Sequence, residues 1–207
     1  MCTRGTMVAS PRVTEERHSD VYIDPTATIA GDVSIGAGTR VWLQVQIREG
    51  SRIGRQCNLG KNVYVGVGVI VGDRCKIENN ASLFDGVRLE DGVFVGPNVV
   101  FANDRLPRAI NPDGTLKNAE DWEIGRSLAQ RGASVGAGAV ILPGRTLGAF
   151  AMIGAGTVVT ADVPSFAVMV GNPGRVVGYT CVCGRRRTPR FDADDRGEQT
   201  CDRCRLA

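Results

Sequence analysis

Residues 57–72 read CNLGKNVYVGVGVIVG, and within them an apolar residue recurs every six positions, at Leu59, Val65 and Val71. The same register continues without a break from Ile23 to Phe101. A period of six fits neither a helix nor an alternating strand, but it suits a short strand and a tight turn repeated as one side of a prism. The sequence therefore predicts a parallel β-helix of stacked three-sided coils. The apolar positions are Ile23, Ile29, Ile35, Val41, Ile47, Ile53, Leu59, Val65, Val71, Ile77, Leu83, Leu89, Val95 and Phe101.

Two further rows accompany the apolar row. Two positions before it stand small or β-branched residues, which we expect to pack beside the large side chains inside the prism. These residues include Ala27, Val33, Thr39, Ser51, Cys57, Val63, Cys75, Ala81 and Val99. One position after it, glycine recurs at Gly36, Gly54, Gly60, Gly66, Gly72 and Gly96. We expect these glycines to turn the corner with backbone dihedral angles that a side chain would resist.

Length and composition narrow the class of protein. A chain of 207 residues can hold one domain with an extended core and a small appendage. A net charge of +3 is too small to argue for nucleic acid. No apolar run approaches the roughly 18 residues of a membrane span, and the N-terminus lacks the apolar block of a signal peptide. We therefore expect a cytoplasmic protein, with Cys57 and Cys75 as core thiols of a reducing compartment.

The chain divides into three parts. Residues 1–19 are polar and predict an N-terminal arm, residues 20–178 predict the β-helix, and residues 179–207 form a Cys-rich tail. The register breaks after Phe101 and resumes at Val135, a distance that is no multiple of six. A loop near residues 103–132 is therefore expected to leave the helix. The helix should end near Pro164, and residues 168–177 should cap its open end.

The tail carries two cysteine pairs with metal-ligand spacing. The motif C-x-C-G is followed after 17 residues by C-x₂-C, which supplies Cys181, Cys183, Cys201 and Cys204. Four thiolates can close a tetrahedral zinc site, and so short a polar segment could hardly fold without one. We therefore predict a structural Zn²⁺. The alternative is a tail of reduced thiols that binds no metal.

Histidine is almost missing from the chain, because His18 is the only one. One histidine cannot supply the three-histidine zinc site of a β-helix carbonic anhydrase, so that activity is disfavoured. His18 could act as a general base, although a histidine in a polar arm more often faces solvent.

The start of the predicted loop is the first place to seek a site, since loops on rigid scaffolds carry binding groups. Asn103 offers an amide that both donates and accepts, and Asp104 offers a carboxylate. The alternative is turn chemistry, which the same two residue types commonly serve.

Several segments resemble a known family. They are KIENNASLFDGV (76–87), LEDGVFVGPNVVFAND (89–104), PRA (107–109), RGASVGAG (131–138) and VGNP (170–173). They resemble the hexapeptide-repeat N-acetyltransferases of amino nucleotide sugars, and most closely the branch that acts on UDP-2-acetamido-3-amino-2,3-dideoxyglucuronate. The resemblance covers roughly residues 20 to 180. It implies a left-handed β-helix and a homotrimer with active sites between neighbouring chains.

The resemblance also implies a reaction and its residues. A sugar amine would attack the thioester of acetyl-CoA directly, and the departing CoA sulfur would take the proton. Asn103 matches the asparagine that positions the amine or polarises the tetrahedral oxyanion, and Asp104 is the local alternative to the CoA sulfur as proton acceptor. Residues expected to bind the nucleotide sugar are Asn79, Asn80, Arg105 and Arg108. Residues expected to lie along acetyl-CoA are Ala137, Gly138, Ala155, Gly156 and Arg175.

The chain departs from the family pattern at Gln44 and Gln46, where histidine is common, and at Ala102, where threonine is common. A dTDP-linked or other nucleotide-linked amino sugar and a longer acyl group therefore stay open. Two other functions also stay open. One is O-acetylation of a sugar or small alcohol, and the other is a scaffold whose zinc-binding tail holds a partner.

Overall fold

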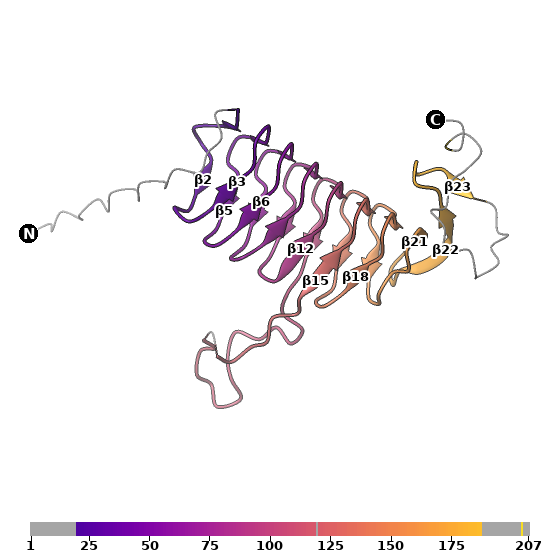
Figure 1. The fold of residues 1–207 in the computed structure, drawn as a ribbon. Helices are drawn as coiled ribbons and strands as arrows, with labels where there is room; N and C mark the ends of the chain where they lie inside the picture. The colour runs from indigo at the N-terminus through magenta and orange to yellow at the C-terminus, as the bar shows by residue number, and fades with distance from the viewer. Residues whose placement is uncertain (1–19, 119, 188–203, 205–207) are drawn as a thin grey trace, which may run out of the picture.

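A computed structural model describes residues 20–118, 120–187 and 204. The chain winds into a solenoid of stacked coils, from which one long loop projects sideways and which a hairpin closes at the C-terminal end (Figure 1). Within the described residues, no helix has the length and hydropathy needed to cross a membrane.

Each coil contributes one strand to each of three sheets, which form the faces of a prism. Face 1 comprises β1 (Tyr22–Ile23), β4 (Arg40–Val41), β7 (Asn58–Leu59), β10 (Lys76–Ile77), β13 (Phe94–Val95), β16 (Ser134–Val135), β19 (Met152–Ile153), β21 (Ala167–Val170), β22 (Arg175–Thr180) and β23 (Arg186–Arg187). Face 2 comprises β2 (Thr28–Ile29), β5 (Gln46–Ile47), β8 (Tyr64–Val65), β11 (Ser82–Leu83), β14 (Val100–Phe101), β17 (Val140–Ile141) and β20 (Val158–Val159). Face 3 comprises β3 (Ser34–Ile35), β6 (Arg52–Ile53), β9 (Ile70–Val71), β12 (Val87–Leu89), β15 (Ser127–Ala129) and β18 (Thr146–Leu147).

The strands pair in parallel at a fixed sequence separation. Tyr22 pairs with Arg40, one coil of 18 residues later. Across the insertion, Phe94 pairs with Ser134, so the strands above and below the loop still stack directly. The chain bends at three corners: corner 1 joins face 1 to face 2, corner 2 joins face 2 to face 3, and corner 3 joins face 3 to face 1. The parallel β-helix and the ejected loop predicted from the period are confirmed.

The interior consists of the two predicted rows. Leu59 and Val65 are completely buried, as are the other large residues of the row from Val41 to Phe101 to within a few per cent. Polar members of the small row bond to the corner of the next coil, because the Thr39 hydroxyl donates to the Gly54 carbonyl (2.8 Å) and the Ser51 hydroxyl to the Gly66 carbonyl (2.7 Å). The core therefore satisfies these two hydroxyls, whereas the buried Thr157 hydroxyl, two positions before Val159, has no hydrogen-bond partner among the described residues.

Glycine is required after the apolar row for a different reason from the one predicted. The left-handed backbone lies two positions later, at residues such as Gly68 (φ 64°) and Asn80 (φ 60°). A Cβ on Gly72 would instead lie 2.7 Å from the backbone nitrogen of Asp91 in the next coil. These positions are glycine because the stacked coils approach too closely for a side chain, and their dihedral angles are ordinary.

The coils that follow the insertion loop begin earlier and end later than the sequence predicted. The chain rejoins the helix at β15, where Ala129 pairs with Leu89 and Leu147, one hexad before Val135. Ala129 escapes the pattern because it is small, although it is fully buried. At the other end the helix continues past Pro164, since Met169 in β21 pairs in parallel with Ile153. The antiparallel β22 then forms the cap, and the boundary predicted at residue 178 falls within this strand.

Candidate active site

The insertion loop, residues 102–126, leaves the helix at corner 2 between β14 and β15. Its two ends are tied together, because the Gly125 amide donates to the Asn103 carbonyl (2.8 Å) and Asp104 forms an antiparallel bridge with Ile124. Below the base, the Ser127 hydroxyl accepts from the amide of Gly144 (3.1 Å). The rigid helix therefore fixes Asn103 and Asp104 even though the rest of the loop projects.

Asn103 and Asp104 have different surroundings. Both are half-buried. One carboxylate oxygen of Asp104 accepts from the Leu106 amide (2.8 Å), so Asp104 serves the turn chemistry considered above. The Asn103 side chain makes no hydrogen bond to another described residue and lines a hollow of about 540 Å³ together with Asp104, Arg108, Lys117 and Trp122, among others. Its amide is available to a ligand.

The loop also bears a larger, more apolar hollow of about 740 Å³. Arg108 and Lys117 line both hollows, and Arg105 lines the larger one. No ion pair joins any of these three cations to a described acidic residue. In the larger hollow these cations lie beside apolar side chains, an arrangement suited to an anionic group attached to a flat or apolar one. Arg105 and Lys117 also line a third hollow, together with the carboxylates of Asp104, Glu120, Asp121 and Glu123.

Two carboxylates hold the loop's internal turns. Hydrogen bonds from the Thr115 hydroxyl (2.7 Å) and amide (3.0 Å) lower the pKa of Asp113. A hydrogen bond from the Asn118 amide (2.9 Å), and a second from the Asn111 side chain, lower the pKa of Asp121. Because both donors favour the charged form, these turns depend on ionised carboxylates.

The residues expected along acetyl-CoA stack at corner 1 of successive coils. Gly138 and Gly156 have left-handed backbones with open space where a Cβ would stand, and both are exposed. The Gly156 amide donates to the carbonyl of Ala137 (2.8 Å). This hydrogen bond joins corner 1 of two successive coils, so that Ala155 and Gly156 continue the column of small residues. Above it the turn before Arg175 rests on the last coil, since the Val158 amide donates to Gly171 (3.0 Å). Arg175 is exposed beside this turn.

Comparison with known proteins agrees with this architecture. A profile described as the hexapeptide repeat of succinyl-transferase matches residues 51–85 and 131–161. The structure of a maltose O-acetyltransferase from Clostridium difficile 630 is 30% identical, with a TM-score of 0.52, over 63% of this chain and 69% of that one. The chain belongs to the hexapeptide-repeat family.

Two further proteins are similar to this hexapeptide-repeat chain. A dTDP-3-amino-3,6-dideoxy-alpha-D-galactopyranose 3-N-acetyltransferase from Aneurinibacillus thermoaerophilus is 50% identical over 60 residues, which are 29% of this chain and 31% of that one. An acetyltransferase from Vibrio cholerae, solved with acetyl coenzyme A, shares the fold at 22% identity, with a TM-score of 0.54 over 63% of this chain and 71% of that one. The matches span 31% and 50% of the length of the first two curated relatives.

Asn79 and Asn80 lie on corner 1, in the same column as Gly138, whereas Asn103 is on corner 2. Each has a structural task in this hexapeptide-repeat chain. The Asn79 side chain accepts from the Lys61 amide (2.8 Å), and Asn80 supplies a left-handed corner and accepts from the Asn62 side chain (3.1 Å). Within one chain they do not join the group at the loop, so their binding of a sugar stays a prediction.

Two residues of the site were not predicted from the sequence. Lys117 and Trp122 line the hollow that contains Asn103, although they lie 14 or more residues further along the chain. No period marks residues inside a loop, so only their residue types could have drawn attention to them. At the C-terminus the structure brings together Cys181, Cys183 and Cys204. Cys201 and His18 lie outside the described residues.

Proposed function

We propose that this protein transfers an acyl group from acyl-CoA, most simply acetyl-CoA, to the amino group of a nucleotide-linked amino sugar. The observation that carries the proposal is the half-buried Asn103 amide, which has no hydrogen bond to a described residue and faces a hollow lined by Arg108 and Lys117. The local 50% identity to an N-acetyltransferase of a dTDP-linked 3-amino sugar supports the same substrate class.

The nucleotide sugar would lie against the insertion loop. Arg105, Arg108 and Lys117 would neutralise the diphosphate, because planar guanidinium groups bind phosphate oxygens in pairs. The apolar wall of the larger hollow, which includes Pro107 and Ile110, would contact the nucleoside. The sugar amine would then reach Asn103 at the base of the loop.

Acetyl-CoA would lie along corner 1. The exposed column of small residues, Ala137, Gly138, Ala155 and Gly156, would let the pantetheine chain approach the backbone closely. Arg175 at the end of this column would meet the phosphorylated end of the molecule. In one chain, corner 1 and corner 2 are different edges of the prism, so a complete site needs corner 1 of one copy beside corner 2 of its neighbour.

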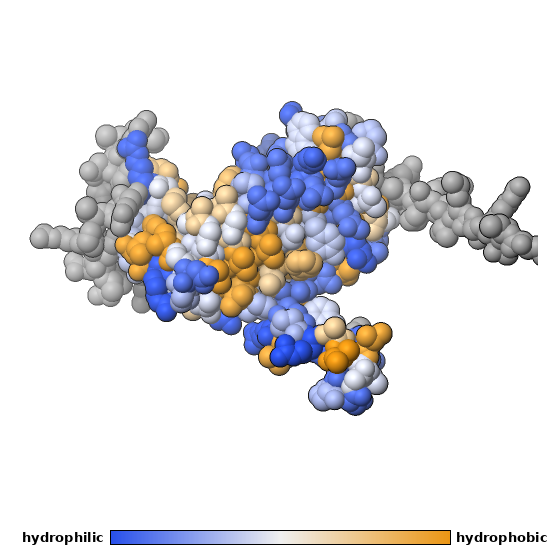
Figure 2. Space-filling model, turned by 180° about the vertical axis from the view of Figure 1, so that it is seen from behind, coloured by the Kyte–Doolittle hydropathy of each residue, from blue (hydrophilic) through white to orange (hydrophobic). Residues whose placement is uncertain are grey.

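An apolar strip on face 2 supports such an assembly. Tyr64, Val100, Val140 and Val158 occupy outward positions of β8, β14, β17 and β20 and are only half-buried, and Phe84 is exposed at the adjoining corner 2. Apolar side chains also gather on the projecting loop, where Leu106 and Leu116 are 77% and 78% exposed (Figure 2). We propose a homotrimer in which these surfaces are buried between copies and the site is completed by a neighbour.

The reaction follows from the groups that this site offers. The neutral amine adds to the thioester carbon, and the carbonyl oxygen becomes an oxyanion that the Asn103 amide stabilises by donating a hydrogen bond. The C–N bond is then complete, the C–S bond breaks, and the CoA thiolate takes the proton that the nitrogen loses. No histidine occurs among the described residues, so the leaving sulfur is the proposed proton acceptor, with Asp104 as the local alternative.

Mass spectrometry of the acetylated product tests the proposal. It is preferred to an assay of released thiol because the protein's own cysteines would also react. Purified protein is supplied with acetyl-CoA and a panel of UDP- and dTDP-linked 3-amino and 4-amino sugars. We expect an N-acetylated product, and we expect Asn103→Ala to lower kcat by roughly 10²- to 10³-fold, the usual cost of removing one oxyanion donor. Asn58→Ala is the matched control, since Asn58 lies on face 1 and, among the described residues, its side chain accepts a hydrogen bond only from the Trp42 indole (2.8 Å).

The other functions have distinct outcomes in this assay. Acetylation of a hydroxyl but never of an amine would replace the proposal with O-acetylation, which the similarity to a maltose O-acetyltransferase favours. That reaction requires a stronger base than the described residues offer, because a hydroxyl is far less nucleophilic than an amine. A folded protein that binds no acyl-CoA would favour the remaining alternative, a non-enzymatic scaffold whose tail holds a partner.

A further inference from the structure

The C-terminal cap ends in a tight turn that carries two cysteines. Residues Cys181 to Gly184 connect β22 to β23, with the Gly184 amide donating to the Cys181 carbonyl (2.8 Å) and the Cys181 amide donating to Arg185 (2.9 Å). Gly184 has a left-handed backbone (φ 80°), so the C-x-C-G order suits the turn. Just before it, the Thr180 amide donates to Phe166 (2.7 Å), which fastens the turn to the last coil.

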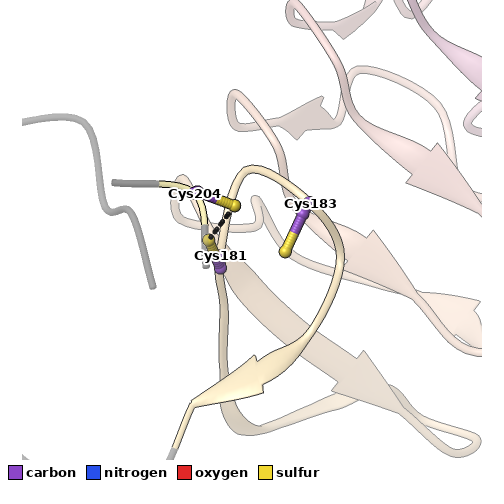
Figure 3. A group of neighbouring side chains, drawn as sticks. All are labelled: Cys181, Cys183 and Cys204. Carbon is purple, nitrogen blue, oxygen red and sulfur yellow. Dashed lines mark hydrogen bonds between the residues drawn. The ribbon is translucent and has the colours of Figure 1, made fainter. Parts of the chain in front are cut away.

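A third cysteine returns to this turn from much further along the chain. The sulfur atoms of Cys181, Cys183 and Cys204 all lie within 4.8 Å of one another, and those of Cys181 and Cys204 are 3.7 Å apart. Figure 3 shows the three sulfur atoms gathered at the turn, with those of Cys181 and Cys204 side by side. A zinc ion bound to thiolates at about 2.3 Å in tetrahedral geometry separates its sulfur ligands by about 3.8 Å. The 3.7 Å between Cys181 and Cys204 matches this separation, and the third sulfur is near enough to share a metal with them, whereas a disulfide would need sulfurs about 2 Å apart.

We propose that Cys181, Cys183 and Cys204 bind one structural Zn²⁺ that locks the C-terminal segment onto the end of the β-helix. Thiolate ligands select a soft or borderline ion such as zinc over magnesium or calcium. The positive side chain of Arg185, which is exposed next to the turn, offsets part of the negative charge of a zinc thiolate centre.

The position of the turn indicates what the metal would do. A Cβ on Gly184 would lie 3.3 Å from the Met152 methyl group, so the turn rests on the outer surface of β19. Cys181 itself is buried, whereas Cys183 is exposed. The metal would therefore cross-link the cap to residue 204 and protect the last strands from pairing with another chain. This inference does not depend on the proposed transferase activity.

Metal analysis of the full-length protein, purified reduced and without chelator, tests the inference. We expect one zinc per chain, and we expect three or more sulfur ligands per zinc by X-ray absorption. Cys183→Ser and Cys204→Ser should each lower the metal content several-fold. Cys57→Ser is the matched control, because its hydroxyl can donate to the Gly72 carbonyl as the Cys57 thiol does (3.1 Å) and as Ser51 does to Gly66.

Folding defects cannot mimic the expected result, because Cys183 is exposed and its replacement leaves the core unchanged. Chelation of the wild-type protein should raise hydrogen exchange in β22 and β23 while the coils stay protected. Three results would overturn the proposal: reduced protein that holds neither zinc nor added Co²⁺, a metal content that Cys183→Ser leaves unchanged, or a zinc site with fewer than three sulfurs.

Discussion

At the scale of single residues, this fold needs glycine for two unrelated reasons. Where glycine follows a large core residue it avoids a collision, as at Gly72, where a Cβ would meet the backbone of residues 90 and 91. The residue two positions later adopts a left-handed backbone, which asparagine supplies at Asn62, Asn80 and Asn98 and glycine supplies at Gly68. Only the first reason forbids every side chain.

This distinction predicts opposite results for two substitutions. Gly72→Ala should lower the free energy of unfolding by about 3 kcal/mol, because neither backbone can move without breaking the ladder. Gly68→Asn should change it by less than about 0.5 kcal/mol, since asparagine tolerates the left-handed region and a Cβ meets nothing within 4 Å. Urea denaturation of both variants measures the difference. Equal destabilisation by the two substitutions would contradict the collision argument.

At the scale of elements, the insertion loop is organised by its own turns and joined to the helix only at its base. Asp113 and Asp121 hold those turns as charged groups, and their pKa values are lowered in the folded loop. A carboxylate with a depressed pKa stabilises the loop above its unfolded value of about 3.9, and this contribution is lost as the pH falls through the lower folded value. At the corners of the β-helix, Asp24 and Glu49 also have lowered pKa values, whereas its buried apolar rows contain no carboxylate.

We therefore expect acid to open the loop before it unfolds the helix, with the transition below about pH 4. The fluorescence of Trp122, in a Trp42→Phe background, reports on the loop, while circular dichroism reports on the strands. The double variant Asp113→Asn and Asp121→Asn is the control, and it should lack the acid transition in fluorescence. The same transition in the double variant would assign it to other carboxylates.

At the scale of the whole molecule, the three faces differ in their outward residues. Face 2 carries Tyr64, Val100, Val140 and Val158, whereas face 1 carries polar residues such as Arg40, Asn58 and Lys76 at the same positions. The inward positions of all three faces are alike, because each must fill the same prism. The difference is one of degree, because face 1 also carries Phe94 and Met152 outward and face 2 carries Gln46 and Ser82. The proposed association through face 2 would account for the valines at its outward positions.

Charge placed on face 2 should dissociate the proposed trimer. Val140→Glu should shift the mass in solution from three chains to one and abolish transferase activity, because a buried unpaired carboxylate is costly at an interface. Ser134→Glu on face 1 is the control and should change neither property. Light scattering after size exclusion measures the mass. A wild-type monomer, or a Val140→Glu protein that remains trimeric, would contradict this assignment of the interface.

The amino-acid sequence alone determined the β-helix, its rows and the existence of the loop, because in a solenoid every core contact recurs at one fixed separation and so appears as a period. It also marked Asn103 and the cysteine motifs by residue type. Only the tertiary structure decided that the chain rejoins the helix at Ala129 and that Lys117 and Trp122 line the same hollow as Asn103. It also decided the approach of Cys204 to Cys181. These contacts join residues at separations that belong to no repeat, so no pattern along the chain encodes them.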